Sequence, residues 1–454
     1  MSLTQSLTRL IRTKPVDQRD LERTALYVLD AAASMVAGAR SRPGRLFMDW
    51  ARQQGNWGKD GLQGDAGRNA LLLGALAHCL ETDDLHRQSV VHPGCVVVPV
   101  PWAIASSGKQ PIGGRRALTA VLHGFEAATR IGRCVGPGHY KIWHNTATCG
   151  PFGSAMAAAY LAELDDESTL NALGNAGTQS AGLWEFLETG AMSKHLHAGR
   201  AAEAGMTAAT LAAHGISGPP QILEGRRGFF AAMCPDASPD LLLNAPDDPW
   251  QLHATSLKPW PSCRHTHPAI DASLELHNQM VEMDIAPEAI AGIEIGAYSA
   301  ALDLCDRREP DSAYGAKFSL QHCVAAALAL GDVRFDAFEG PARERFTALR
   351  GLANLSCDEK LDAAYPSSWG GRVTLTLKDG GEIWAERIHA RGDPEMPLAS
   401  DEIRSKAAKL LEWGGLDDPL PFVDAILATA EGGDLPPLPL TSDKDGAKSA
   451  KAVD

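Results

Sequence analysis

The sequence has 454 residues, a length that favours two domains over one and leaves ample material for a buried pocket. Apolar residues make up 44% and charged residues 22%, which is typical of a folded globular protein and excludes a largely disordered chain. The formal net charge of −14, without a dense stripe of lysine and arginine, argues against nucleic acid as a partner.

The N-terminal segment MSLTQSLTRLIRTKPVDQRD lacks the apolar core of a signal peptide, and no later apolar stretch is long enough to span a bilayer. We therefore expect a cytoplasmic protein with no membrane partner. The first fourteen residues contain no acids, which leaves a mitochondrial presequence as the alternative.

Nine cysteines without a C-x-x-C pair indicate reduced thiols rather than a disulfide framework or a structural zinc site. The sequence also lacks the glycine-rich fingerprints of nicotinamide and nucleotide-phosphate binding and the G-x-S-x-G motif of serine hydrolases. We therefore expect neither a cofactor nor a metal.

Residues 1–254 form the first part of a predicted large helical domain. The apolar stretches RTALYVLDAAASMVAGA, NALLLGALAHCLETDD, GPFGSAMAAAYLAEL and GRAAEAGMTAATLAAHG are rich in alanine, leucine and methionine. Their alanine and glycine stripes would let neighbouring helices approach closely, so we interpret these stripes as core packing.

The pattern changes after Ala254, and residues 255–393 predict a smaller α+β domain. IAGIEIGAYSAAL reads as a strand, and SLQHCVAAALALGD reads as a buried helix. GRVTLTLKDGGEIWAERIHARG predicts a hairpin that turns at Asp379, Gly380 and Gly381.

The last part of the chain returns to helical patterns. Residues 394–434 contain SDEIRSKAAKLLEWGG and PFVDAILATAEGG, which predict helices that rejoin the first domain. Residues 435–454 are first proline-rich and then polar, which predicts a disordered tail.

A first cluster of acids and histidines lies in HCLETDDLHRQSVVHPG. If the preceding apolar helix continues into this segment, His78, Glu81 and Asp84 lie on one face. Asp83 then points elsewhere, and His92 follows before a Pro-Gly pair. Spacing alone favours a solvated, capped helix end over an active site.

A second cluster lies in WHNTATCGPFGSA, where Pro151 predicts a helix that begins near Gly150. His144 then lies just before a helix N-terminus, where unpaired backbone N–H groups favour an anion. A surface loop is the alternative interpretation.

A third cluster lies in SKHLHAGRAAEAGMTAATLAAHG, where Lys194, His195 and His197 precede a helix that ends before Gly215. A lysine in an enclosed pocket can bind a carboxylate or move a proton. An exposed charged loop is the alternative, and the histidine spacing gives little support for zinc.

A fourth cluster lies in KPWPSCRHTHPAIDA, where Pro268 predicts a helix start. Cys263, Arg264 and His267 precede or enter this helix, so a fixed cation lies beside another helix N-terminus. Three basic or titratable clusters of this design suggest a shared anionic ligand.

Taken in order, these segments resemble the MmgE/PrpD family. The resemblance extends from about Leu21 to Leu411 and is most specific in the segment SKHLHAGRAAEAG and in EGRRGF, which follows it. It implies a mainly α fold with an α+β part, in which a large helical domain is interrupted by a smaller α+β lid domain. It also implies a homodimer with a metal-free site.

By motif, the resemblance implies nine site residues in this chain. The catalytic candidates are His144, Lys194, His92 and Asp84. The substrate-binding candidates are Glu81, His197, Cys263, Arg264 and His267.

The resemblance further implies a small polycarboxylate substrate and proton abstraction next to a carboxylate. A dehydration like that of 2-methylcitrate dehydratase is the first expectation. An iminodisuccinate-like epimerase and a cis-aconitate decarboxylase-like activity are the next alternatives. Glu81 and Leu85 stand where the family commonly has Asp and Thr, which leaves an inactive polycarboxylate-binding homologue as the last alternative.

Overall fold

The computed structural model describes residues 1–59, 61–108 and 111–440. Two compact units divide the chain. The first contains Met1–Leu257 and the segment that begins at Ala399, and the second contains Lys258–Leu398. The predicted class, mainly α with an α+β part, is confirmed.

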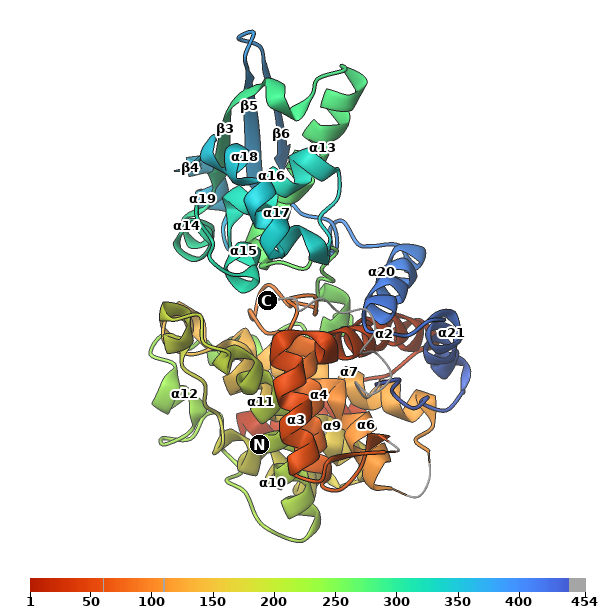
Figure 1. Ribbon diagram of the computed structural model, residues 1–454. Helices are drawn as coiled ribbons and strands as arrows, with labels where there is room; N and C mark the ends of the chain where they lie inside the picture. The colour runs from red at the N-terminus through yellow and green to blue at the C-terminus, as the bar shows by residue number, and fades with distance from the viewer. Residues whose placement is uncertain (60, 109–110, 441–454) are drawn as a thin grey trace. The chain divides into compact units, whose positions relative to one another are not determined.

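The first unit is built from helices that vary widely in length (Figure 1). Their bounds are α1 Leu3–Thr13, α2 Gln18–Arg40, α3 Arg42–Gln53, α4 Ala66–His78, α5 Pro93–Val97, α6 Pro99–Ser107, α7 Gly114–Gly132, α8 Gly136–Tyr140, α9 Asn145–Leu161, α10 Asp166–Gly177, α11 Ser193–Ala213, α12 Phe229–Met233, α20 Ser400–Trp413 and α21 Leu420–Ala428. A hairpin of two short strands, β1 (Trp57–Gly58) and β2 (Gly61–Leu62), is an exception to the predicted all-helical composition.

Helix α11 is central to this unit and packs against α4, α9 and α10. Glycines make the close approach possible. A Cβ atom on Gly199 would lie 2.4 Å from the backbone oxygen of Leu71 in α4, and one on Gly205 would lie 2.4 Å from the backbone nitrogen of Ala155 in α9. The prediction that the alanine and glycine stripes pack in the core is confirmed.

Helices α20 and α21 belong to the same unit as α2, although they follow the second unit in the chain. Lys406 of α20 forms an ion pair with the buried Asp30 of α2 at 2.5 Å. Its ammonium group also donates a hydrogen bond to the backbone oxygen of Thr82 at 2.7 Å. These contacts attach α20 directly to α2 and to the segment that follows α4.

The second unit contains a four-stranded sheet and several helices (Figure 1). Its elements are α13 His267–Glu282, β3 Ile290–Ala297, α14 Ser299–Cys305, α15 Ala313–Lys317, α16 Leu320–Leu330, α17 Gly340–Arg345, α18 Thr347–Gly351, β4 Ala353–Cys357, α19 Glu359–Ala364, β5 Gly371–Leu377 and β6 Glu382–Arg387. The strand order is β4-β3-β5-β6, with β3 and β4 parallel and the other pairs antiparallel. Helix α13 packs against β5, β6 and α16.

The predicted buried helix and hairpin of this unit are confirmed as α16 and the β5–β6 pair. The predicted strand is confirmed over β3, but its last residues are wrong because α14 begins at Ser299. The turn between β5 and β6 contains Gly380 at a φ of 88°, a left-handed conformation that glycine adopts without a steric penalty. Asp379 supports the turn by accepting a hydrogen bond from the backbone N–H of Gly381 at 2.9 Å.

The start of the predicted disordered tail is wrong. The backbone N–H of Leu435 donates to the oxygen of Ile112 at 2.9 Å, and the oxygen of Pro436 accepts a hydrogen bond from the indole of Trp102 at 2.8 Å. The rest of that prediction, from residue 441 onward, lies outside the described residues. Across the described ranges, no helix has both the length and the apolar character needed to cross a membrane.

Candidate active site

The segment after α4 turns back over the end of that helix. Helix α4 ends at His78, and Glu81 adopts a φ of 60°, a left-handed conformation that residues other than glycine rarely adopt. The predicted continuation of the helix, with His78, Glu81 and Asp84 on one face, is therefore wrong. The reversal brings Asp83, which was expected to point elsewhere, to His78: the Oδ2 atom of Asp83 lies 2.6 Å from Nδ1 of His78.

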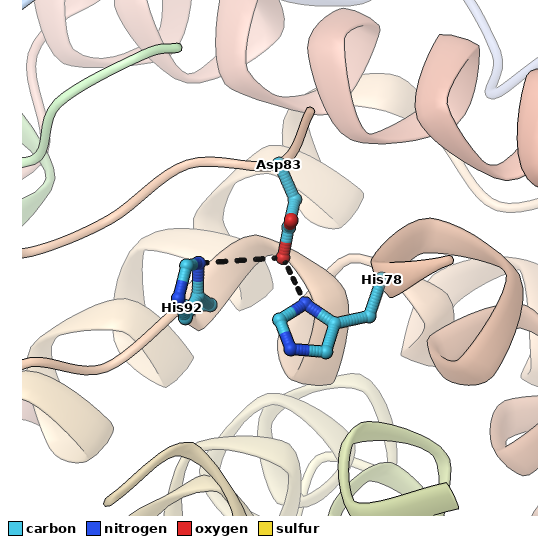
Figure 2. Close-up of side chains that lie close together, drawn as sticks. All are labelled: His78, Asp83 and His92. Atoms are coloured by element: carbon cyan, nitrogen blue, oxygen red, sulfur yellow. Dashed lines mark hydrogen bonds and ion pairs between the residues drawn. The ribbon is translucent and has the colours of Figure 1, made fainter. Parts of the chain in front are cut away.

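Asp83 lies between two histidines, as Figure 2 shows. Besides its hydrogen bond with His78, its Oδ2 atom lies 3.5 Å from Nδ1 of His92. That nitrogen is 2.5 Å from the backbone oxygen of Asp84, which can only accept, so Nδ1 of His92 carries the hydrogen. His78, Asp83 and His92 are all buried.

Asp84 is buried and interacts with the start of α5. Its carboxylate oxygens accept the backbone N–H of Gly94 at 2.9 and 3.2 Å. A Cβ atom on Gly94 would lie 2.9 Å from both oxygens, so glycine is needed for this approach. Burial, followed by the negative charge of Asp83, raises the pKa of Asp84 well above its usual value. A carboxyl group in this environment keeps its proton to a higher pH than an exposed carboxyl group does.

Glu81 and Lys194 form a buried ion pair, although they lie 113 positions apart in the sequence. Lys194 lies in the first turn of α11 rather than before the helix as predicted, because α11 begins at Ser193. The packing of α4 against α11 brings the two side chains together. The predicted end of this helix is confirmed, since Gly215 follows it at a φ of 85°.

His144 is the N-cap residue of α9. Its backbone N–H donates to the oxygen of Gly182 at 2.9 Å, and its Nδ1 lies 3.4 Å from Nδ1 of His197 on α11. The predicted helix start near Gly150 is wrong, because α9 begins at Asn145 and contains Pro151 in its interior. Proline removes a single intrahelical hydrogen bond there, and the surrounding packing tolerates the loss.

Burial has a strong effect on the histidines around Lys194. It lowers the pKa of His144 well below its usual value, with further contributions from His78 and Lys194. Burial also lowers the pKa of His195 to about 3 and that of His197 to about 4. These three imidazoles are therefore neutral near pH 7 and can accept protons.

The ring of His78 lies near three other imidazoles. Its centroid is 4.9 Å from that of His92, 5.8 Å from that of His144 and 6.5 Å from that of His195. Three segments distant in sequence thus contribute to one group of side chains, buried except for the partly exposed His197. We call it the histidine cluster: His78, His92, His144, His195 and His197.

Two aromatic side chains border this cluster and were not predicted from the sequence. The ring centroid of Trp184 lies 4.7 Å from that of His144, and the ring centroid of Phe186 lies 5.5 Å from that of His197. Both belong to a short 3-10 helix at Trp184–Glu188. Their position shortly before the SKHLH motif is the signal that could have indicated them. His78, Asp83 and His195 were also absent from the predicted site.

The other three predicted site residues belong to the second unit. Arg264 is buried and forms an ion pair with the buried Asp393, while Nε and Nη1 of its guanidinium group have no hydrogen-bond partner among the described residues. Cys263 precedes Arg264, and His267 begins α13 with Pro268 in its first turn, as predicted. Their participation in a common site with the histidine cluster stays a prediction.

The fold and the cluster define a class of mainly helical protein with an additional α+β unit and a buried group of imidazoles, carboxylates and a lysine. Residues 6–242 match the model of the MmgE/PrpD N-terminal domain, and residues 260–416 match that of the MmgE/PrpD C-terminal domain. The chain therefore belongs to the MmgE/PrpD family, which confirms the resemblance seen in its motifs.

Several curated relatives are similar over most of their length. The chain is 24% identical to the cis-aconitate decarboxylase of Homo sapiens over 472 residues, which cover 96% of each protein. It is 26% identical to the cis-aconitate decarboxylase of Mus musculus over 375 residues, 78% of this chain and 74% of the relative. It is also 26% identical to the cis-aconitate decarboxylase-like protein oryM of Aspergillus oryzae over 363 residues, 75% and 74% of the two chains. Decarboxylases of this kind are lyases.

Proposed function

We propose that the protein is a lyase that acts on a small polycarboxylate by moving a proton next to a carboxylate. The observation that carries this proposal is the opposite effect of burial on two groups of the first unit. His144 is held neutral and ready to accept a proton, whereas Asp84 is held in a form that can donate one. Elimination needs both functions at the same pH.

The first candidate reaction is the dehydration of a hydroxy-polycarboxylate of the 2-methylcitrate type. His144 takes the proton from the carbon next to a carboxylate, and the electron pair of that C–H bond forms the carbon–carbon double bond. The C–O bond breaks, and the hydroxyl group takes a proton from Asp84 or His92 and leaves as water. The products are the alkene and one water molecule.

Lys194 provides positive charge for the substrate in this proposal, and Arg264 is a separate candidate for binding a carboxylate. Lys194 would stabilise the negative charge that develops as the proton leaves, while Glu81 holds its ammonium group in place. Arg264 would bind a substrate carboxylate through its guanidinium group, whose Nε and Nη1 are buried without a hydrogen-bond partner in the described part of the chain.

The second candidate is a decarboxylation like that of cis-aconitate, because the relatives reported above are named for it. In that reaction the bond to a carboxylate breaks, carbon dioxide leaves and the electron pair is protonated at carbon. The same buried acid could provide that proton. The identities of 24% and 26% leave room for a change of substrate.

A panel of polycarboxylates in D₂O, followed by proton NMR, separates the candidates. 2-Methylcitrate, citrate, cis-aconitate and iminodisuccinate are incubated separately with the protein. A new alkene signal indicates dehydration, and loss of a carboxylate with deuterium in the product indicates decarboxylation. Recovered substrate that contains deuterium and has lost its stereochemical purity indicates an epimerase. Binding without turnover or deuterium exchange contradicts the proposal.

Two variants test the assignment of residues. His144→Ala and Lys194→Met should each lower turnover at least about 10²-fold, because each removes a group that acts only during proton transfer. The exposed His214→Ala is the matched control and should leave the rate unchanged. Near-normal turnover in both site variants would contradict the assignment.

A further inference from the structure

His78 has a nitrogen that the fold leaves without a partner. The side chain is fully buried, and its Nδ1 is hydrogen-bonded to Asp83 at 2.6 Å. Its Nε2 has no hydrogen-bond partner among the described residues. A buried polar atom without a hydrogen bond is unfavourable and rare, and such an atom can indicate a functional role.

The hydrogen bond to Asp83 determines what Nε2 can do. A carboxylate accepts, so Nδ1 of His78 carries the hydrogen and Nε2 carries the lone pair when the ring is neutral. The same carboxylate stabilises the positive charge that the ring gains when Nε2 takes up a proton. The Asp83–His78 pair is therefore built to hold a proton on Nε2 and to release it.

The two donors inferred from the sequence are engaged elsewhere. The Asp84 carboxylate accepts the backbone N–H of Gly94 at the start of α5 with both oxygens. Nδ1 of His92 donates to the backbone oxygen of Asp84, and the backbone N–H of His92 donates to Thr146 at 3.1 Å. Both residues thus also connect segments of the chain, so the fold uses their polar atoms for structure as well as for the donor role considered above.

The position of His78 suits proton transfer opposite His144. The two rings are nearly parallel, at an angle of 21°, with centroids 5.8 Å apart. A positive charge on His78 is among the causes that lower the pKa of His144. A proton on one ring therefore disfavours a proton on the other, as a paired acid and base require.

We propose that His78 is a catalytic residue, and that its Nε2 gives a proton to the leaving hydroxyl group of a hydroxy-polycarboxylate. Asp83 is its positioning residue. This inference rests on the proposed function. The C–O bond breaks, the proton on Nε2 joins the leaving oxygen to form water, and the ring becomes neutral. The proton that His144 takes from the substrate carbon then restores the balance of protons in the site.

The same three residues could also be read as a metal site, because donor atoms of His78, Asp83 and His92 lie within 4.8 Å of one another (Figure 2). Their hydrogen bonds argue against coordination through the two ring Nδ1 atoms. A metal ligand must offer a lone pair, whereas Nδ1 of His92 carries a hydrogen that it donates to the Asp84 carbonyl. Nδ1 of His78 likewise carries a hydrogen.

The test compares His78→Gln, Asp83→Asn and His144→Gln in the full chain, with the substrate that the polycarboxylate panel identifies. His78→Gln should lower dehydration at least about 10²-fold but retain deuterium exchange into unreacted substrate, because proton abstraction by His144 survives. His144→Gln should lose both. Asp83→Asn should lower kcat with little change in KM, and His78→Lys should restore part of the rate at high pH.

The matched control is His123→Gln, which removes a buried histidine of the same unit that stacks on Trp250. It should leave the rate within about threefold of the parent protein. Dehydration by His78→Gln within threefold of the parent, with the fold intact by circular dichroism, would overturn the proposal. So would one equivalent of bound metal whose removal abolishes turnover.

A readout that does not depend on turnover separates this inference from the proposed function. Nitrogen-15 NMR of the histidines should find His78 protonated at Nδ1, and saturation with tricarballylate, an unreactive tricarboxylate, should shift its Nε2 resonance. If the parent protein converts no member of the panel, the proposed function fails. The NMR experiment still decides the inference, because an unshifted Nε2 overturns it.

Discussion

The carboxylate of Glu81 forms a buried ion pair with the ammonium group of Lys194, and the backbone of Glu81 adopts a left-handed conformation, with a φ of 60°. A strained residue next to a buried charge pair is typical of a functional site. Both side chains are almost entirely buried, with exposed fractions of 2% for Glu81 and 6% for Lys194. The pair is therefore the natural place to test how the site is maintained.

Replacing Glu81 by Gln should destabilise the first unit strongly. The change removes the negative charge that Glu81 places beside the buried Lys194 ammonium, and breaking a buried ion pair typically costs about 3–5 kcal/mol of unfolding free energy. Urea denaturation followed by tryptophan fluorescence measures the loss. Asp166→Asn is the control, because Asp166 pairs with Arg12 at an exposed position where pairs contribute at most about 1 kcal/mol. Equal effects of the two changes would contradict the prediction.

Replacing Gly199 by Ala should separate α11 from α4. In an exposed helix this change stabilises by roughly 0.5–1 kcal/mol, but here the new Cβ atom would lie 2.4 Å from the Leu71 oxygen. Overpacking of this kind typically costs about 1–3 kcal/mol. We expect a net loss of stability and lower turnover, because α11 carries Lys194. Gly113→Ala is the control, since a Cβ there meets nothing within 4 Å. A stabilised G199A protein would refute the prediction.

Stability should decrease as the pH falls below about 6.5, the usual pKa of an unfolded histidine. Burial, followed by the charge of Arg133, lowers the pKa of His86 to about 3. Between these pH values His86 binds a proton in the unfolded chain but not in the folded chain. Its contribution to the unfolding free energy is therefore complete above pH 6.5 and is lost as the pH falls toward 3. The raised pKa of Asp84 acts with the opposite sign and offsets part of the loss.

The variant His86→Gln isolates this contribution. It should reduce the dependence of the unfolding free energy on pH, between pH 6 and pH 4, by about 1.4 kcal/mol per pH unit. Urea denaturation at several pH values measures the slope. His214→Gln, at an exposed position, should leave it unchanged. An unchanged slope in His86→Gln would show that the buried histidine titrates as it does in the unfolded chain.

Replacing Arg264 by Lys should weaken substrate binding. Lysine keeps the charge opposite Asp393 but loses the planar fork that binds a carboxylate through two hydrogen bonds. We expect KM to rise roughly tenfold, which corresponds to about 1.4 kcal/mol, with a smaller change in kcat. Steady-state kinetics measure both constants, and Arg334→Lys, at an exposed pair with Asp332, is the control. An unchanged KM would place Arg264 outside the substrate site.

The sequence predicted elements whose signals are local. Pro268 lies in the first turn of α13, Gly215 follows the end of α11, and the Asp379–Gly381 turn joins β5 to β6. In each case a few adjacent residues fix the backbone, because proline, glycine and aspartate restrict it or hydrogen-bond to it directly.

The predicted helix bounds failed where contacts outside the helix decide them. Helix α4 stops at His78 because the chain folds back to place Asp83 on that ring, and α9 starts before Gly150 because His144 caps it while bound to Gly182. Neither contact has a local signal. Both contacts depend on how the chain packs beyond the helix, which residue spacing within the helix does not encode.

The sequence by itself determined the family, the mainly helical fold and most of the chemically active side chains, because these depend on residue type and spacing. Only the tertiary structure decided which of them meet. The ion pair between Glu81 and Lys194 joins residues 113 positions apart, and the orphaned Nε2 of His78 exists because a chain reversal gives its other nitrogen to Asp83. Burial then separates the proton affinities of His144 and Asp84, since desolvation disfavours charge on each, and only the packed fold determines which groups are buried.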